Sequence, residues 1–275
     1  MAWETILLER DGPLRLLTLN RPHVLNAISR QMVHELGEAF AEVEADRDAR
    51  VLLITGAPRP DGRPCFSAGA DLKEAHRRRQ GSPPGEPLRH TLDSAWEVLQ
   101  NDGPRNESIY HPLFASLERM RTPSIAVVDG ICTTGGLELI LACDLRIVAD
   151  TAEISDWHIK NLGVIGGAGV TTRLPQLVGT ARAKELMWTG APLTGEEAFR
   201  IGLANRVVPS ATLLDEAKAL ARSIAARSPY AIAASKAVID AAARQSPADG
   251  IRYGYLWSAL IALQRQLEGE PPEIE

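Results

Sequence analysis

The sequence predicts an α/β fold, with a core of alternating strands and helices followed by a helical C-terminal block. Short apolar runs bounded by glycine and proline alternate with amphipathic helical patterns over residues 1–209. The composition, 45% hydrophobic and 24% charged, is that of an ordinary globular protein. From residue 210 onward the pattern is helical. We therefore expect an α/β core over 1–209 and a helical region over 210–275.

The first part of the chain predicts a hairpin, a helix and a buried strand. Thr5–Glu9 and Leu14–Leu19 are β-prone runs separated by a turn signal at residues 11–13. Ser29 is a candidate N-cap for a helix whose apolar stripe comprises Val33, Leu36, Phe40 and Val43. Val51–Ile54 is a short continuous apolar run, which is typical of a strand buried on both faces.

The later part of the chain repeats this alternation before it becomes helical. Buried strands are expected at Ile125–Val128 and Leu145–Val148. The glycine-dense run over 163–169 leads into a helix, and Thr194 with Glu197 predicts a capping box for the next helix. The C-terminal helices are expected at Leu213–Ala226, Ala231–Ala243 and Ile251–Leu267.

Charge and cysteine content narrow the function classes. The net charge of −5 argues against a surface for nucleic acid or for an anionic membrane. Cys65, Cys132 and Cys143 show no metal-ligand spacing, so we expect reduced thiols and no metal site. Charges in the first residues exclude the apolar stretch of a signal peptide, and no apolar run approaches the ~20 residues of a membrane span. We expect a cytoplasmic protein.

Two loops share one character: a strand ends, small residues follow and a helix begins. They are Ser67–Asp71 and Thr133–Leu137. Small residues allow a ligand to approach the backbone closely, and the N–H groups at a helix start attract developing negative charge. Two such loops facing one another would form an oxyanion hole. Small residues also serve ordinary packing of a helix on a strand, and for each loop alone both interpretations stand.

Glu138 is a single carboxylate inside the apolar run Leu137–Ala142. Burying such a charge is unfavourable unless the group is paired or used. An apolar setting would raise its pKa and bring the carboxyl group closer to acid–base work at neutral pH. The alternative is a glutamate in the first helical turn that interacts favourably with the helix dipole and does nothing else.

Six segments, taken in order, resemble the crotonase family, also called the enoyl-CoA hydratase/isomerase superfamily. One segment is weak, but six in series are specific, and the resemblance covers residues 5–210. The segments are NRPHVLNA (20–27), VLLITG (51–56), CFSAGADLKE (65–74), AVVDGICTTGGLELILACDLRIVADTAEI (126–154), GVIGGAGVTTRLPQLVG (163–179) and LTGEEAFRIGLANRVVP (193–209).

The resemblance implies a spiral of ββα units with a C-terminal helical block, assembled as a homotrimer or as a hexamer of two trimers. It implies an acyl-CoA substrate whose thioester oxygen is held by the amides of Ala70 and Gly135, with Glu138 in the place of the first catalytic glutamate. Coenzyme A is then part of the substrate, and no separate cofactor is expected. The residues near the adenine and the pantetheine arm would be Val24, Leu25, Ala27, Ala68, Asp71, Leu72 and Lys73.

The chain departs from the family pattern where a second catalytic glutamate is expected. Counting forward from Ala152 reaches His158, and counting back from Gly163 reaches Ile159, because this segment is one residue longer than usual. Asp156, His158 and Lys160 alternate along it and would share one face of an extended chain. Glu138 and His158 would then divide the acid–base steps. Neutral His158 would activate water, and Asp156 would orient the imidazole ring. A structural histidine at the rim of a pocket remains the alternative.

A second departure lies between Asp71 and Pro123, which is longer than in short-chain hydratases. The polar stretch over 77–108 has weak periodicity and predicts a surface excursion with short helices. In the family this excursion borders the acyl pocket, so the resemblance implies Tyr110, His111 and Phe114 as candidates for substrate contact. Ordinary surface helix is the other interpretation.

The function expected from the residues and the resemblance is that of a lyase of fatty acid metabolism, a hydratase that adds water across an α,β-unsaturated thioester. Double-bond isomerisation through Glu138 is an alternative. So is hydrolysis of a C–C bond of the β-diketone type, because some members of the superfamily use His and Asp for it. A non-catalytic scaffold or RNA-binding relative is the alternative from another class.

Overall fold

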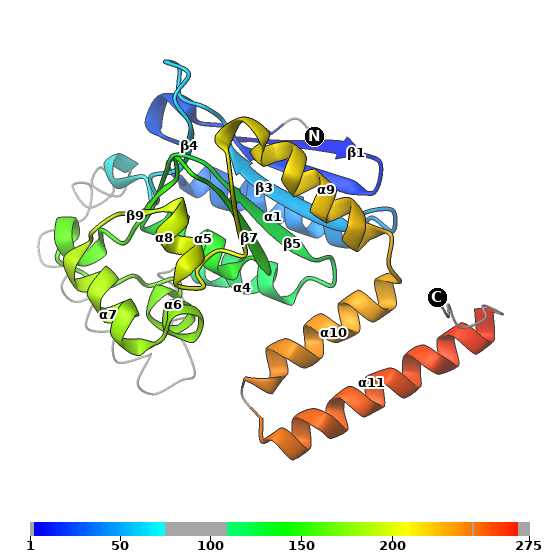
Figure 1. The fold of residues 1–275 in the computed structure, drawn as a ribbon. Helices are drawn as coiled ribbons and strands as arrows, with labels where there is room; N and C mark the ends of the chain where they lie inside the picture. The colour runs from blue at the N-terminus through cyan, green and yellow to red at the C-terminus, as the bar shows by residue number, and fades with distance from the viewer. Residues whose placement is uncertain (1–2, 75–108, 244, 269–275) are drawn as a thin grey trace, which may run out of the picture.

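The computed structural model describes residues 3–74, 109–243 and 245–268 (Figure 1). Within these ranges, six strands form one sheet in the order β1-β2-β3-β5-β7-β10. β1 and β2 form the expected antiparallel hairpin, and the other neighbours pair in parallel. The strands are β1 (Ile6–Asp11), β2 (Leu14–Leu19), β3 (Val51–Gly56), β5 (Ser124–Val128), β7 (Leu145–Ala149) and β10 (Arg206–Val208).

A second, smaller sheet has the order β4-β6-β8-β9 within the described ranges. Its strands are β4 (Cys65–Ser67), β6 (Ile131–Thr133), β8 (Glu153–Ser155) and β9 (Leu193–Thr194). β4, β6 and β8 each follow a strand of the large sheet along the chain, and each is followed by a helical segment. This repeat of strand, strand and helix is the spiral of ββα units that the resemblance implies.

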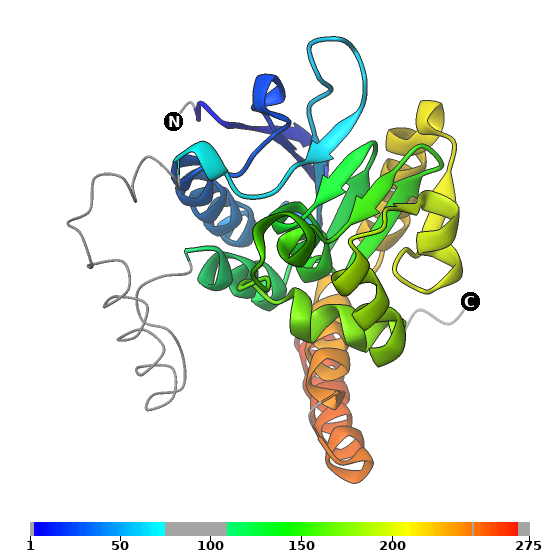
Figure 2. The ribbon, with the colours of Figure 1, turned by 90° about the vertical axis from the view of Figure 1, so that its left-hand side faces the viewer.

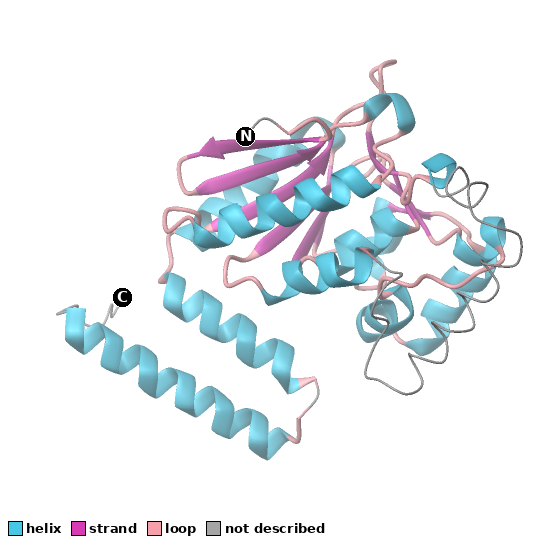
Figure 3. Cartoon of the chain, turned by 180° about the vertical axis from the view of Figure 1, so that it is seen from behind, coloured by secondary structure: helices cyan, strands magenta, loops and turns pink. Residues whose placement is uncertain are grey.

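Successive side chains along the strands of the large sheet point to opposite faces, and both faces are buried. In β3, Leu52 and Ile54 pack into one apolar core with α1 (Arg30–Ala45). Leu53 packs into the other core with α9 (Leu213–Ala225), which crosses the near face of the sheet in Figure 1. The opposite face, seen from behind, is crossed by α1 (Figure 3). Side chains of a strand point alternately to the two faces, which explains a continuous apolar run.

α1 and α5 show how the sequence fixes its helices. Ser29 is the predicted N-cap of α1, and its hydroxyl oxygen accepts a hydrogen bond from the amide of Met32 at 3.2 Å. α5 (Gly135–Ala142) is buried along its whole length. A helix that is apolar on every side belongs in the interior, and each buried leucine or isoleucine contributes about 1.5–3 kcal/mol. Packing therefore fixes the position of Glu138, its acidic residue.

The remaining helices surround α5 and the small sheet. The capping box of α8 is confirmed, since the Thr194 hydroxyl accepts from the Glu197 amide at 3.2 Å and Glu197 accepts from the Thr194 amide at 2.9 Å. α7 was not expected from the sequence. These elements are η1 (Pro22–Val24), α4 (Tyr110–Arg119), η2 (His158–Leu162), α6 (Val170–Val178), α7 (Thr180–Thr189), α8 (Gly195–Arg200) and η3 (Ser210–Thr212).

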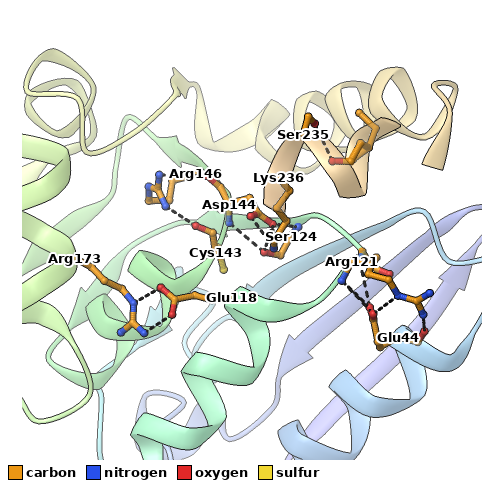
Figure 4. Close-up of polar contacts among 12 residues, drawn as sticks. Glu44, Glu118, Arg121, Ser124, Cys143, Asp144, Arg146, Arg173, Ser235 and Lys236 are labelled. Atoms are coloured by element: carbon orange, nitrogen blue, oxygen red, sulfur yellow. Dashed lines mark hydrogen bonds and ion pairs between the residues drawn. The ribbon is translucent and has the colours of Figure 1, made fainter. Parts of the chain in front are cut away.

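The C-terminal block forms an arm outside the core. α10 (Pro229–Ala242) and α11 (Pro247–Glu268) lie against one another and project from the sheets (Figures 1 and 2). Lys236 of α10 ties this arm to the core through an ion pair with Asp144 at 2.8 Å (Figure 4). α10 and α11 carry exposed apolar side chains, among them Ile239, Ile251, Tyr255, Leu256, Leu260 and Leu263.

Three sequence-based predictions concern the stretch over 77–108, membrane-spanning segments and the C-terminal helical region. The surface excursion predicted over 77–108 lies outside the described residues. Within the described ranges, every helix falls short of the combined length and apolar character that crossing a membrane requires. The division of the chain at residue 210 and the assembly role of the helical region stay predictions.

Candidate active site

The two loops of small residues meet. An isolated parallel bridge pairs Ile28 with Ala70, and its hydrogen bonds run from the Ile28 amide and from the Asp71 amide. The Ala70 N–H is therefore directed away from this bridge. Gly135 begins α5, so its N–H belongs to the first turn, which has no carbonyl partner within the helix. A Cβ added to Gly135 would lie 3.3 Å from the Ala70 nitrogen.

Thr134 and Gly69 show why both loops need these residues. Thr134 adopts φ 49° and ψ −118°, which is a rare conformation for a residue with a side chain. Its hydroxyl donates to the Ala68 carbonyl at 3.0 Å and so joins the two loops. A Cβ on Gly69 would fall 1.7 Å from that hydroxyl oxygen and 2.7 Å from the Gly135 nitrogen. Only glycine fits at position 69. The resulting close approach of the two loops brings the amides of Ala70 and Gly135 together.

The segment expected to contact coenzyme A is built around the same loop. Leu25 and Asn26 both have positive φ, and the buried Asn26 amide donates to the Cys65 carbonyl at 3.0 Å. Arg21 pairs with Asp71 at 3.0 Å. The Ala68 amide donates to the Leu25 carbonyl at 2.9 Å. The turn after β2 and the loop after β4 thus lie side by side. The turn carries Val24, Leu25 and Ala27, and the loop carries Ala68, Asp71, Leu72 and Lys73. Their contact with coenzyme A stays a prediction.

Glu138 lies one turn into α5 and is 3% exposed. One carboxylate oxygen, Oε1, accepts hydrogen bonds from the amides of Ala168 at 2.8 Å and Val170 at 3.3 Å. The other oxygen, Oε2, lies 3.9 Å from Nε2 of His158. Burial raises the pKa of Glu138, while His158 and the two amides act against that rise.

His158 and Asp156 form a pair beside Glu138. Nδ1 of His158 lies 2.5 Å from Oδ1 of Asp156, whose side chain is fully buried. Within the described residues, Oδ2 of Asp156 has no hydrogen-bond partner. Burial lowers the pKa of His158, but Asp156 and then Glu138 outweigh it, and the net pKa lies above the ordinary histidine value of 6.5. The site thus stabilises the protonated form of His158 relative to a histidine in water.

The expectation of an extended chain from Asp156 to Lys160 is wrong. The chain leaves β8 at Ser155 and enters one turn of π-helix, η2, at His158. The Asp156 side chain accepts from the His158 amide at 3.2 Å, so a local turn joins the pair. Lys160 is exposed and packs its stem on Gly190, where an added Cβ would lie 2.7 Å from Cδ of the lysine. A π-helical turn contains more residues than an α-helical turn, which fits the extra residue that the sequence comparison places in this segment.

Sequence reasoning missed the groups that hold Glu138 in place. They are the amides of Ala168 and Val170, at the end of the glycine-dense run over 163–169. Gly166 of the same run lies directly against the pair, because a Cβ there would fall 2.7 Å from Oε1 of Glu138 and 3.0 Å from Cε1 of His158. The density of glycine was the available signal for a close approach to the backbone.

The residues suggested for the acyl pocket occupy three different settings at the start of α4. The Tyr110 hydroxyl donates to the Ile28 carbonyl at 3.1 Å, next to the bridge that holds Ala70. Phe114 is fully buried in the core, and the two rings are 6.4 Å apart. His111 is exposed. Their contact with a substrate stays a prediction.

The three cysteines lie in the interior of the protein. Cys65, Cys132 and Cys143 are free and buried, and burial raises the pKa of Cys65 to about 11 and that of Cys143 to about 12. Thiols of this kind are unreactive. In the described ranges, no three His, Cys, Asp or Glu side chains gather in a way that could hold a metal ion.

Comparison with known proteins finds one family repeatedly. Residues 9–254 match the family model of enoyl-CoA hydratase/isomerase. The protein "Probable enoyl-CoA hydratase echA8" of Mycobacterium tuberculosis is 36% identical over 100% of this chain and 96% of its own length. The short-chain-enoyl-CoA hydratase of Clostridium acetobutylicum is 32% identical over 87% of this chain and 82% of its own.

Solved structures give the same result for the fold. An enoyl-CoA hydratase subunit of Geobacillus kaustophilus matches with a TM-score of 0.79 and 31% identity, covering 99% of this chain and 98% of its own. An enoyl-CoA hydratase of Mycobacterium smegmatis matches with a TM-score of 0.78 and 27% identity, covering 98% of each chain. The mixed α/β core and the helical C-terminal block are thus shared with these structures.

Proposed function

Since the chain belongs to the enoyl-CoA hydratase/isomerase family, we propose that it adds water across the double bond of an α,β-unsaturated acyl-CoA. The observation that carries this proposal is the buried pair of Glu138 and His158, with Oε2 and Nε2 3.9 Å apart. Hydration needs one group that takes a proton from water and another that delivers a proton to the α-carbon. The pair supplies both groups.

The amides of Ala70 and Gly135 would hold the thioester oxygen. When water attacks the β-carbon, the electrons of the C=C bond move toward this oxygen, and an enolate forms. Fixed N–H donors aimed at that charge stabilise the enolate without reorganisation, and each typically contributes ~3–4 kcal/mol to the transition state. The absence of side chains at Gly69 and Gly135 lets the two loops approach closely, so that both donors can serve one oxygen.

Glu138 is proposed as the base for water. Its Oε1 accepts from two amides, which stabilises the carboxylate form, and its Oε2 faces His158. The separation of 3.9 Å exceeds a direct hydrogen bond, so each atom keeps its proton or lone pair for a third partner. A water there gives its proton to Oε2 while its oxygen bonds to the β-carbon. Burial makes the carboxylate more basic.

His158 is proposed as the acid. Asp156 accepts from Nδ1 at 2.5 Å, so the proton that moves is the one on Nε2. The buried carboxylate of Asp156, whose other oxygen has no hydrogen-bond partner among the residues that the structure describes, stabilises the neighbouring imidazolium. The imidazolium then protonates the α-carbon of the enolate, and the product is a 3-hydroxyacyl thioester. This assignment reverses the sequence-based expectation, in which neutral His158 activates water.

Two other reactions have support from particular residues. Isomerisation of a double bond needs only one base beside the oxyanion hole, which Glu138 provides. Hydrolysis of a C–C bond is favoured by the His158 and Asp156 pair, because an imidazole oriented by a carboxylate activates water. We propose hydration rather than either of these reactions because hydration uses the side chains of Glu138, His158 and Asp156 together.

The finer features of the protein extend this proposal. The residues around the turn after β2 and the loop after β4 would bind coenzyme A. Because coenzyme A is the thioester part of the substrate, we propose no separate cofactor. The helical region over 210–275 would assemble the chain into trimers or pairs of trimers, and its exposed apolar side chains on α11 support this assembly. A cytoplasmic location and a place in fatty acid metabolism belong to the same proposal.

The test is to mix the protein with a short enoyl-CoA and follow the loss of the absorbance of the conjugated thioester. The expected result is a decrease that stops at an equilibrium mixture, with a 3-hydroxyacyl-CoA as product. An isomerase would shift the double bond without gaining mass. Inertness toward every acyl-CoA would contradict the proposal and favour a scaffold or RNA-binding protein.

A further inference from the structure

The loop that holds Glu138 is itself held by Arg173 of α6. The amides of Ala168 and Val170 donate to Oε1 of Glu138, and the peptide that joins Ala168 to Gly169 lies between them along the chain. The carbonyl oxygen of this peptide accepts a hydrogen bond from Nη1 of Arg173 at 2.6 Å. The guanidinium therefore fixes the peptide that lies between the two donors to Glu138.

Glu118 of α4 fixes Arg173 in turn. Its two carboxylate oxygens accept from Nε and from Nη2 of Arg173, the latter at 2.7 Å (Figure 4). One edge of the guanidinium is thus bonded to Glu118, and Nη1 is bonded to the Ala168 carbonyl. The Arg173 side chain is 13% exposed and that of Glu118 is 36% exposed. A bidentate pair of this kind sets orientation as well as distance, because both partners are planar.

Gly169 shows how closely the guanidinium lies on the loop. It adopts φ +118°, and a Cβ added to it would fall 1.8 Å from Nη1 of Arg173. Any other residue there would displace the guanidinium from the Ala168 carbonyl. The glycine, the arginine and the glutamate thus form one arrangement that runs from α4 to the loop before α6.

We propose that Arg173 and Glu118 are positioning residues, which hold the Ala168 and Val170 amides on Oε1 of Glu138 so that Oε2 faces His158. The inference rests on the proposed function, in which Glu138 is the base for water. Without the guanidinium the loop is free to move, and Glu138 loses donors that keep it ionised and in one orientation. A displacement near 1 Å at a reacting group lowers the rate by up to about 10²-fold.

The test is Arg173→Met, with the hydration rate measured from acid to alkaline pH. We expect kcat to fall roughly 10- to 100-fold, with KM for the enoyl-CoA within a few-fold of wild type. The acid limb of the profile should move to higher pH, since fewer N–H donors stabilise the Glu138 carboxylate while the charges facing it, His158 and Asp156, remain. Arg173→Lys keeps the charge without the planar fork, and we expect an intermediate rate.

Arg121→Met is the matched control. Arg121 also forms an ion pair with a carboxylate, that of Glu44 at 2.7 Å, and also donates to a backbone carbonyl, at 3.2 Å (Figure 4). It touches neither the loop nor Glu138, so we expect the wild-type pH profile and rate. A loss of the same size in Arg121→Met would mean that arginine pairs act here through stability, and the proposal would be overturned.

Glu118→Gln carries the test if Arg173→Met does not fold. It keeps the bond from Arg173 to the Ala168 carbonyl and weakens the fork, so we expect a smaller shift of the acid limb in the same direction. An unchanged limb in the variant that folds overturns the proposal. Glu138→Gln distinguishes the two claims. If it is severely impaired while Arg173→Met is normal, the positioning role alone fails; if Glu138→Gln itself is normal, the proposed function fails.

Discussion

Oε2 of Glu138 and Nε2 of His158 face one another across 3.9 Å inside the protein, although 19 positions separate the two residues along the chain. These positions include a strand of each sheet, β7 and β8. Each side chain is oriented by its other end. Two backbone amides hold Oε1 of Glu138, and Asp156 holds Nδ1 of His158. Oε2 of Glu138 and Nε2 of His158 are therefore the atoms available to a substrate. In the proposed mechanism Oε2 accepts a proton and Nε2 donates one.

Glu138→Gln should abolish the base while keeping the shape of the side chain. We expect acyl-CoA binding close to wild type and turnover lower by about 10²–10⁴-fold, the usual scale for an acid–base group. Binding is measured by calorimetry and turnover by the loss of enoyl thioester absorbance. Turnover within a few-fold of wild type would refute the assignment of Glu138.

The dependence of turnover on pH should be bell-shaped. Glu138 must be ionised, and burial raises its pKa above the ordinary 4.5, so activity should rise with pH through a limb above that value. His158 must be protonated, and Asp156 and Glu138 outweigh burial to raise its pKa above 6.5, so activity should fall through a limb above that value. The two limbs describe the coupled pair. A neutral His158 base would instead give activity that rises through the imidazole range.

Gly135→Pro removes one donor of the oxyanion hole. We expect turnover to fall by at least ~10²-fold in a protein that still folds and assembles, as judged by circular dichroism and sizing. Gly135→Ala separates the donor from the space around it, because it keeps the N–H but adds a Cβ 3.3 Å from the Ala70 nitrogen. Normal activity of the proline variant would mean that another group holds the thioester oxygen.

Gly166→Ala should disturb the pair without touching the hole. The added Cβ would lie 2.7 Å from Oε1 of Glu138 and 2.4 Å from Cγ1 of Val170, so the carboxylate must shift. We expect a loss of kcat of roughly 10-fold or more, since misplaced reacting groups lose that much. Gly167→Ala is the control, because a Cβ on that glycine meets nothing within 4 Å. Equal rates for both variants would show that the pair tolerates displacement.

The sequence predicted the elements that packing or capping imposes locally. Periodicity located α1 and its cap at Ser29, and continuous apolar runs located β3 and β5. The strands of the small sheet, such as β4 and β8, are three residues long and carry no pattern that could be distinguished from a loop. Their existence follows from long-range pairing, which a local pattern does not contain.

The site was predictable where a single residue carries the chemistry and unpredictable where the backbone does. Glu138 was conspicuous as a charge in an apolar run, and His158 as the residue in an expected position. The donors to Glu138 are amides of Ala168 and Val170, which have ordinary side chains, and Arg173 acts through a carbonyl. The extended chain predicted through His158 was wrong because the Asp156 side chain closes a turn on the backbone.

His158→Gln separates the two possible divisions of labour. If His158 delivers the proton to the α-carbon, the variant should lose water addition, the alkaline limb of the pH profile, and exchange of the α-proton of a saturated acyl-CoA with solvent deuterium. If Glu138 handles the α-proton and His158 activates water, the exchange should partly survive. An unchanged rate and profile would make His158 structural, and Asp156 would be the next residue to substitute.

In the proposed function, the pair of Glu138 and His158 adds one molecule of water to an enoyl thioester. The most direct measurement is mass spectrometry of the product formed from an enoyl-CoA in water labelled with heavy oxygen. We expect the wild type to form a 3-hydroxyacyl-CoA of unchanged carbon number that carries one labelled oxygen. The rate of its formation should fall by about 10²–10⁴-fold in Glu138→Gln and in His158→Gln. A product that carries no label, or a labelled fragment of shortened carbon chain, would contradict the proposed function.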